Sequence, residues 1–182
     1  MALKLTTSYL EDSLELFRYY KQLAERAIEQ CPDKGLFAAL DNESNCIAIV
    51  VKHMVGNMRS RWTDFLVSDG EKPDRHRDSE FEDPPKTRAE ILDLWDAGWN
   101  CVFTALAALN DASMTETVTI RGEEHSVMQA INRQIAHYAQ HVGQIVLLAK
   151  HFAGEEWKTL TIPKRRKELG DRSQNAAAPR RS

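Results

Sequence analysis

Two histidines four residues apart are the feature of this sequence most suited to chemistry. His137 and His141 lie in the stretch His-Tyr-Ala-Gln-His. Because a helix turns once in about 3.6 residues, this spacing places both imidazoles on one face, about one turn apart. A helix with this pattern can offer two ring nitrogens to a single metal ion. The pair therefore indicates two ligands of a possible metal site.

A third histidine lies in a separate stretch that is apolar and helical in pattern. His53 follows Ile-Ala-Ile-Val-Val-Lys and precedes Met-Val. An imidazole within an apolar helix needs a polar partner. If the two helices pack together, three neutral imidazoles converge and leave open coordination positions, as catalytic zinc sites do. The alternative is that the three histidines are core or surface residues with ordinary hydrogen bonds.

The spacing is not that of a zinc protease of the His-Glu-x-x-His class. In that motif a glutamate follows the first histidine and acts as the general base. Here that place is Tyr138, so the pattern carries no carboxylate to activate water. Any base must come from elsewhere, or a metal-bound hydroxide or thiolate must act directly. We expect the other histidines, His76, His125 and His151, to be structural or loop residues, with His125 the best functional candidate among them.

Residues that follow His53 on the same helical stretch are candidates for substrate binding: Asn57, Arg59, Arg61 and Trp62. Asn57 and Arg61, four and eight residues beyond His53, share or adjoin its face. Arg59 or Arg61 could bind an anionic part of a cosubstrate, or could belong to a solvated or salt-bridged face. Trp62 could line a pocket together with Trp95 and Trp99, although their helical spacing is also typical of a core.

Four long segments with helical periodicity must position these residues. The first runs from about 8 to 30, the second from the cluster 41–45 to about 66, the third from 87 to about 109 and the fourth from 126 to about 152. Capping boxes open three of them, at Ser8, Thr87 and Ser126. The β-branched stretch 117–120 before the last segment indicates a short hairpin that turns near Gly122. The sequence therefore predicts an all-α four-helix bundle with a possible β-hairpin before the last helix.

Two polar segments stand outside this pattern. Residues 68–86 form a long loop without a period, and such loops are usually functional or disordered. Phe81 and the mixed charges indicate that the loop packs, as a cover over one end of the bundle. We divide the chain into a bundle at 1–157 and a basic, flexible tail at 158–182. The Lys-Arg-Arg-Lys run of the tail could contact nucleic acid or serve as an address, but without interleaved aromatic residues a solvated tail is favoured.

Composition narrows the function classes. With 182 residues and 42% hydrophobic content the chain suits one domain with a real core. A net charge of −3 gives no strong overall attraction to nucleic acid or to an anionic membrane. Three cysteines without Cys-x-x-Cys spacing argue against a disulfide framework and against a thiolate zinc site. No signal peptide and no apolar run of a membrane span occurs, so we expect a cytoplasmic protein.

These residues resemble the DinB/YfiT-like superfamily of putative metalloenzymes, and more narrowly an uncharacterised bacterial DinB-like branch. The resembling segments are 44–62, which contains His53, 69–73, and 132–145, which contains His137 and His141. The overall match covers about residues 5–155. The resemblance implies a bundle with up-down-down-up topology. It also implies a metal triad of one histidine from the second helix and a His-x-x-x-His from the fourth, which maps onto His53, His137 and His141.

The resemblance further implies a divalent ion, with zinc or nickel foremost and iron or manganese as further candidates. It implies a homodimer, and relatives include S-transferases that use low-molecular-weight thiols and a thiol-dependent isomerase. We therefore expect a metal-dependent transferase or hydrolase that acts on a small molecule, with a low-molecular-weight thiol as a possible cosubstrate. The alternatives are a non-catalytic metal-binding or stress-response protein, and a purely structural bundle. The narrower branch carries no assigned reaction.

Overall fold

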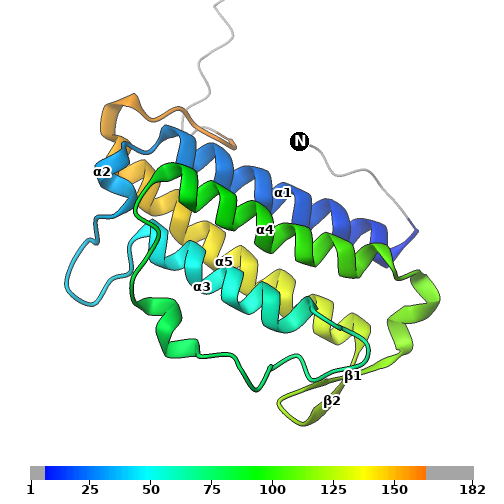
Figure 1. The fold of residues 1–182 in the computed structure, drawn as a ribbon. Coiled ribbons are helices and arrows are strands. Elements are labelled where there is room, and N and C mark those ends of the chain that lie inside the picture. The colour runs from blue at the N-terminus through cyan, green and yellow to red at the C-terminus, as the bar shows by residue number, and fades with distance from the viewer. Residues whose placement is uncertain (1–6, 163–182) are drawn as a thin grey trace, which may run out of the picture.

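A computed structural model describes residues 7–162 and is mostly helical (Figure 1). Its helices are α1 (Tyr9–Gln30), α2 (Asp33–Leu36), α3 (Ile47–Trp62), α4 (Arg88–Ala107) and α5 (Val127–Ala153). Short 3-10 turns are η1 (Arg77–Phe81), η2 (Asp111–Thr115) and η3 (Gly154–Glu156). Strands β1 (Thr117–Ile120) and β2 (Glu123–Ser126) precede α5. Most of the predicted basic tail, from residue 163 onward, lies outside the described residues.

The helix starts follow the capping residues of the sequence. The side chains of Ser8, Thr87 and Ser126 accept hydrogen bonds from backbone N–H groups three residues on, which satisfies donors that a helix leaves unpaired. The second long helix differs from its expected range. It begins at Ile47 and ends at Trp62, because Thr63 turns to extended backbone and Asp64 adopts a φ of 49°. The short helix α2 was not expected from the sequence.

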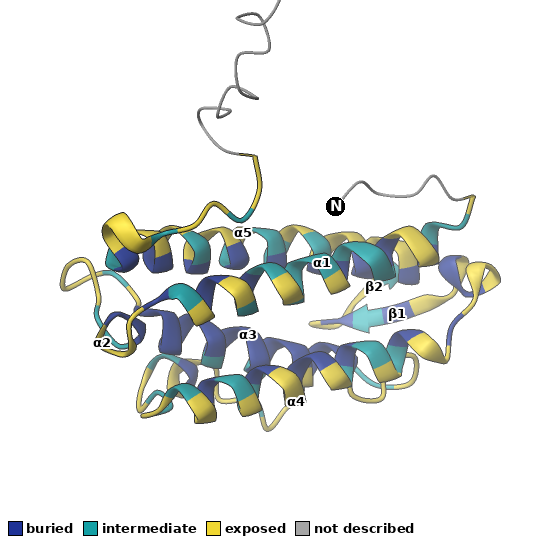
Figure 2. Cartoon of the chain, turned by 90° about the horizontal axis from the view of Figure 1, so that it is seen from above, coloured by how far each residue is buried: buried dark blue, intermediate teal, exposed yellow. Residues whose placement is uncertain are grey.

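The four long helices pack pairwise, α1 with α4 and α5, and α3 with α4 and α5. The facing sides of α1, α4 and α5 are buried and their outer sides exposed, whereas α3 is buried along most of its surface (Figure 2). Trp62, Trp95 and Trp99 are all buried in the hydrophobic core, which is the second of the two alternatives that their helical spacing left open. A Cβ at Gly98 would lie 2.8 Å from a methyl carbon of Val55, so this glycine allows α4 to approach α3 closely. The helical class is confirmed, and the up-down-down-up topology stays a prediction.

The predicted hairpin is present as an antiparallel pair, with Thr117 opposite Ser126 and Ile120 opposite Glu123. Its two turn residues, Arg121 and Gly122, have φ values of 57° and 76°, as a two-residue hairpin loop requires. The Asp69 carboxylate accepts hydrogen bonds from both of their backbone N–H groups, at 2.8 and 2.7 Å. The start of the long loop is thereby fixed to the hairpin.

The long loop 68–86 runs along α3 instead of covering one end of the helices (Figure 1). Near the end of α3, the Gly70 carbonyl accepts a hydrogen bond from Ser60 at 2.8 Å. Near the middle of α3, Lys52 donates to the Glu82 carbonyl at 2.6 Å. The loop therefore returns along the helix and lays η1 against it. Within residues 7–162, no helix combines the length and apolar character needed to cross a membrane.

Candidate metal centre

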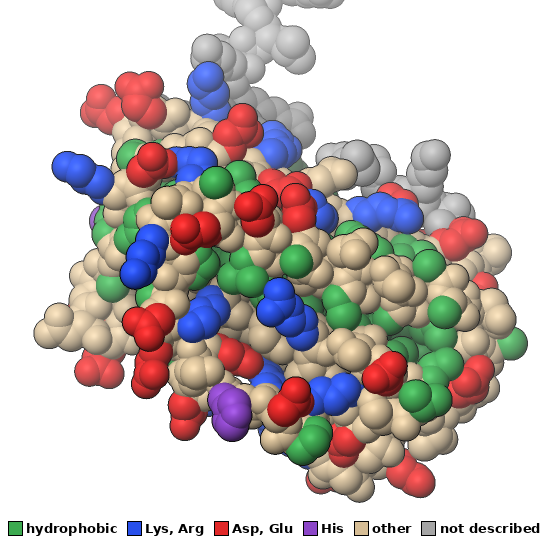
Figure 3. Space-filling view, in the orientation of Figure 1, with side chains coloured by type: hydrophobic (Ala, Val, Ile, Leu, Met, Phe, Trp, Pro, Cys, Tyr) green, Lys and Arg blue, Asp and Glu red, His purple; other side chains and the backbone are tan. Residues whose placement is uncertain are grey.

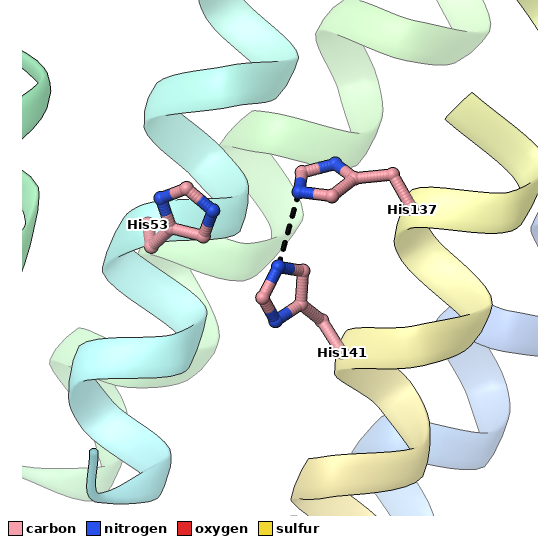
Figure 4. A group of neighbouring side chains, drawn as sticks. All are labelled: His53, His137 and His141. Carbon is pink, nitrogen blue, oxygen red and sulfur yellow. Dashed lines mark hydrogen bonds between the residues drawn. The ribbon is translucent and has the colours of Figure 1, made fainter. Parts of the chain in front are cut away.

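Helices α3 and α5 bring the three histidines singled out from the sequence together. His53 points from α3 toward His137 and His141, which lie one turn apart on α5 (Figure 4). One ring nitrogen from each residue lies within 4.8 Å of the other two. The Nε2 atoms of His137 and His141 are 3.0 Å apart. The spacing on one helix and the packing of a second helix thus create a three-nitrogen cluster.

Burial favours the neutral form of the His137 and His141 imidazoles. Burial, with smaller contributions from the neighbouring charges of His141 and His53, lowers the pKa of His137 to about 3. Burial also lowers the pKa of His141, although a hydrogen bond to Gln144 works in the opposite direction. Near pH 7 both rings are therefore uncharged. A neutral imidazole has one nitrogen with a free lone pair, which is the form that binds metal.

Hydrogen bonds select which nitrogen keeps its proton. His53 Nδ1 lies 2.8 Å from Glu80 Oε2, and His141 Nδ1 lies 2.7 Å from Gln144 Oε1. A carboxylate and an amide oxygen only accept, so Nδ1 donates in both rings. The lone pair is then on Nε2. Metal-binding histidines are oriented in the same way, with the second nitrogen bonded to a carboxylate or an oxygen acceptor.

The cluster fits a divalent metal ion. Two nitrogens held by one tetrahedral zinc ion at about 2.0–2.1 Å lie about 3.3 Å apart, close to the 3.0 Å between His137 and His141. His53 offers the third nitrogen, within 4.8 Å of the other two. The Nδ1 atom of His137 is buried and has no hydrogen-bond partner among residues 7–162, so a molecule bound beside the cluster can satisfy it. Imidazole ligands suit zinc, nickel, iron and copper alike.

Glu80 is a site residue that the sequence analysis missed. It lies in η1 with 6% of its surface exposed, and Arg75 donates to both of its carboxylate oxygens at 2.7 and 3.0 Å. Burial works to raise the pKa of Glu80, but the hydrogen bonds from His53 and Arg75 lower it below its ordinary value. The next residue, Phe81, stacks on the His53 ring with centroids 4.9 Å apart. The loop therefore orients His53 from two sides.

Gly56, one turn after His53, provides the space that Glu80 occupies. A Cβ at this position would lie 2.6 Å from Glu80 Cδ and would contact Oε1 even more closely. Real Cβ atoms essentially never approach so near, so any larger residue must displace the carboxylate. A side chain at position 56 of α3 is therefore incompatible with the observed position of Glu80. The absence of a side chain at residue 56 is a condition for the contact between Glu80 and His53.

A cavity of about 440 Å³ opens beside the cluster. It is lined by His53, Asn57, Arg61, Arg75, Arg77, Phe81, Arg121, Arg133, Gln134, His137, Gln140 and His141. Of the four candidate substrate-binding residues, the structure therefore brings Asn57 and Arg61 to the histidines. Arg59 is exposed and lines a separate groove with Lys52. Trp62 is buried, and its Nε1 donates to the Tyr138 hydroxyl at 2.9 Å.

The other histidines lie away from the cluster. His125 is on β2, and its Nε2 is 3.9 Å from a Glu123 carboxylate oxygen. His76 and His151 are exposed. Tyr138, which takes the place of the protease glutamate, is fully buried in the core. Burial raises its pKa, so its hydroxyl keeps its proton.

A model of one protein family, described as "Protein of unknown function (DUF1572)", matches residues 4–166. Searches of curated proteins and of solved structures found no match. The match includes all three clustered histidines and the whole loop that carries Glu80. It does not extend to a wider superfamily, so the DinB-like relationship stays a prediction.

Proposed function

The chain belongs to the DUF1572 family of proteins of unknown function, and we propose that it is a divalent-metal-dependent enzyme. His53, His137 and His141 would hold the ion. The observation that carries the proposal is their convergence, with one ring nitrogen from each within 4.8 Å of the others at the edge of a cavity. Three protein ligands leave a coordination position open, as catalytic zinc sites do.

A divalent ion bound there would lower the pKa of a thiol or water and polarise an electrophile. The residues of the chain have separate tasks. Glu80 accepts a hydrogen bond from His53 Nδ1 and thereby leaves the lone pair on Nε2, the nitrogen available to the metal ion. Phe81 holds the plane of the same ring by stacking. Asn57 and Arg61 line the space in which a substrate would lie.

The proposed reaction class is thiol S-transfer, with hydrolysis as the second option. Hydrolysis by activated water commonly uses a carboxylate or histidine base. The carboxylate nearest to the cluster, Glu80, already accepts from His53 and from Arg75, so both of its oxygens are engaged. A thiol needs less assistance, because its proton is lost at a pKa near 8.5 even without a metal. A low-molecular-weight thiol and a small-molecule electrophile are the proposed substrates.

The test compares turnover of an electrophile with candidate thiols by metal-loaded wild-type protein and by the His53→Ala variant. His151→Ala is the matched control, since His151 is an exposed histidine on α5. We expect turnover that requires both metal and thiol, that is retained in His151→Ala and that is lost in His53→Ala. Equal rates of turnover in wild type and His53→Ala would refute the proposal.

A non-catalytic metal-binding or stress-response protein is the second candidate. The observation that favours it is the engagement of Glu80, which leaves no free carboxylate beside the cluster within residues 7–162. Stoichiometric metal together with no turnover and no small-molecule binding would select this function. Turnover that depends on the metal would exclude it.

Finer features are proposed with the function. They are a DinB-like up-down-down-up bundle, an ion that is zinc or nickel before iron or manganese, a homodimer and a cytoplasmic location. Pairwise packing of the four long helices supports the bundle. Three free thiols, Cys31, Cys46 and Cys101, support a reducing compartment. Light scattering that reports only a species of 20.7 kDa would refute the dimer.

A further inference from the structure

Arginine is the most frequent residue in the lining of the cavity beside the histidines. Arg61, Arg75, Arg77, Arg121 and Arg133 reach it from α3, the long loop, the hairpin and α5. These segments are far apart in sequence, so the fold gathers the five guanidinium groups at one place. A guanidinium is always charged and presents paired donors that match the oxygens of carboxylates and phosphates.

Carboxylates neutralise only part of this charge. Glu71 receives hydrogen bonds from Arg61 at 2.9 Å, from Arg75 at 3.1 Å and from Arg121 at 2.9 Å. Glu80 pairs with Arg75. The five arginines that line the cavity and the two carboxylates that pair with their guanidinium groups leave an excess of three positive charges in this cluster, before any metal ion is counted. The pairing also holds three of the arginines in fixed positions.

The two remaining arginines are available to a ligand. Arg77 stacks over Phe81, with its Cζ 5.2 Å from the ring centroid, and has no ion pair within the described residues. Arg133 on α5 likewise has neither a hydrogen bond nor an ion pair in the range 7–162. Both side chains are exposed at the cavity. Their charges are therefore accessible to a molecule that enters from solvent.

A buried polar group without a partner provides a second and independent observation. Asn57 is 6% exposed, and its Oδ1 has no hydrogen-bond partner among residues 7–162. Arg61 Nε and Gln134 Oε1 are also buried without a hydrogen-bond partner among these residues. Arg61 and Gln134, however, line a void of about 10 Å³, which is large enough for one water molecule that hydrogen-bonds to both. Asn57 does not line that void. An amide can present either its oxygen or its NH₂ group to a ligand, so Asn57 supplies a polar contact inside the cavity.

The positive charge at the cavity is opposite in sign to the net charge of the chain. The whole chain has a net charge of −3. Acidic and basic side chains are interspersed on the face shown in Figure 3, with no broad basic surface. A volume of about 440 Å³ is that of a small-molecule site. These features favour a small anion over a nucleic-acid strand, which needs an extended basic surface.

We propose that this cavity binds a small polyanion through its phosphoryl or carboxylate groups. Arg77 and Arg133 contact the anionic groups, and Asn57 contacts a polar group of the same molecule. The ligand then lies beside the histidine cluster. Its assignment as substrate or cosubstrate rests on the proposed function, but binding itself does not require a metal.

The experiment is calorimetric titration of the full-length, tag-free protein at about 0.1 M salt, in metal-loaded and metal-free forms. The probes are glycerol 2-phosphate, tricarballylate and, as the neutral control, glycerol. We expect saturable binding of at least one anion and none of glycerol. The two anions distinguish a phosphoryl from a carboxylate ligand. Failure of both anions to bind either form of the protein would overturn the proposal.

Variants identify the residues responsible. The double replacement Arg77→Gln and Arg133→Gln should weaken anion binding by about tenfold or more, because two charged hydrogen-bond donors are lost. Both positions are exposed, so the fold should survive, which circular dichroism checks. Arg59→Gln is the matched control, since Arg59 is an exposed arginine on α3 that lines another groove. Equal weakening by the control would refute the assignment.

The outcomes separate this proposal from the metal proposal. Anion binding by a protein that takes up no metal would leave the polyanion site standing and would remove the metalloenzyme. Stoichiometric metal without anion binding would leave the metal site standing and would remove the polyanion site. Asn57→Asp gives a further check, because a carboxylate at that position should repel the anion and lower its affinity while metal binding is retained.

Discussion

Replacing Gly56 by alanine adds one methyl group where the Glu80 carboxylate packs. The new Cβ would lie 2.6 Å from Glu80 Cδ, so Glu80 must leave its position beside His53. The alanine itself favours the helix by about 1 kcal/mol over glycine. Against this, the buried carboxylate loses hydrogen bonds to His53 and Arg75, and charged hydrogen bonds contribute about 1.5–3 kcal/mol each. Loss of two such hydrogen bonds, less the gain in the helix, gives an expected net loss of about 2–5 kcal/mol in the free energy of unfolding.

The same change should weaken metal binding. His53 loses the acceptor that fixes its Nδ1 proton, and loss of such an acceptor typically lowers metal affinity about 10–100-fold. The assay is competition with a chromophoric chelator for the metal, together with urea unfolding of the metal-free protein. Glu80→Gln should lower the affinity in the same direction, because a neutral amide replaces the carboxylate that accepts from His53.

Gly143→Ala is the matched control for Gly56→Ala. Gly143 is also inside a helix, α5, and a Cβ there would have no neighbour within 4 Å. It should raise the free energy of unfolding by about 0.5–1 kcal/mol and leave metal affinity unchanged. If Gly56→Ala behaves like Gly143→Ala in both assays, the role assigned to Glu80 is wrong.

Two further predictions concern stability. Burial works to raise the pKa of Glu71, but hydrogen bonds from Arg61 and Arg121 lower it to about 2 from 4.5. A carboxyl with a lowered pKa stabilises the fold fully above pH 4.5 and loses that contribution as the pH falls toward 2. The difference in the free energy of unfolding between wild type and Glu71→Gln should therefore shrink over this window. Urea unfolding at several pH values measures the difference, and a constant value would contradict the pairing of Glu71 with the arginines. Tyr138→Phe should lower the free energy of unfolding by about 1–3 kcal/mol, because Trp62 Nε1 loses its buried acceptor, and should leave metal affinity the same. Thermal or urea unfolding measures the change. An unchanged stability would show that this hydrogen bond contributes nothing.

Local sequence signals were sufficient for the helices and for the histidine pair on α5. Capping at Ser8, Thr87 and Ser126 depends on residues three apart, and a four-residue spacing places His137 and His141 together on any helix. The proximity of His53 was conditional on the packing of two helices. The periodicity of the sequence could not decide that condition, and the structure meets it.

Helical geometry explains which candidates near His53 reach the cavity. At about 100° per residue, Asn57 and Arg61 lie about 40° and 80° from His53 around the helix. Arg59 lies about 120° away in the opposite direction and Trp62 about 180° away, which directs them to another face. The rotation of about 100° per residue, applied to the sequence alone, therefore separates Asn57 and Arg61 from Arg59 and Trp62.

Glu80 could not be found by such reasoning. It is 27 residues from His53 in a loop without a period, and its burial depends on contacts with Arg75 and on the space at Gly56. These are tertiary contacts, and no local pattern encodes them. The same holds for the arginine cluster, whose members come from four separate segments.

The central claim is that His53, His137 and His141 together hold one metal ion. Elemental analysis of protein purified without a histidine tag tests it most directly. We expect close to one divalent ion per chain in the wild type and in the His151→Ala control, and loss of the ion in His137→Ala. A wild-type protein that takes up no stoichiometric metal when supplied with zinc or nickel, or a His137→Ala variant that retains it fully, would contradict the claim.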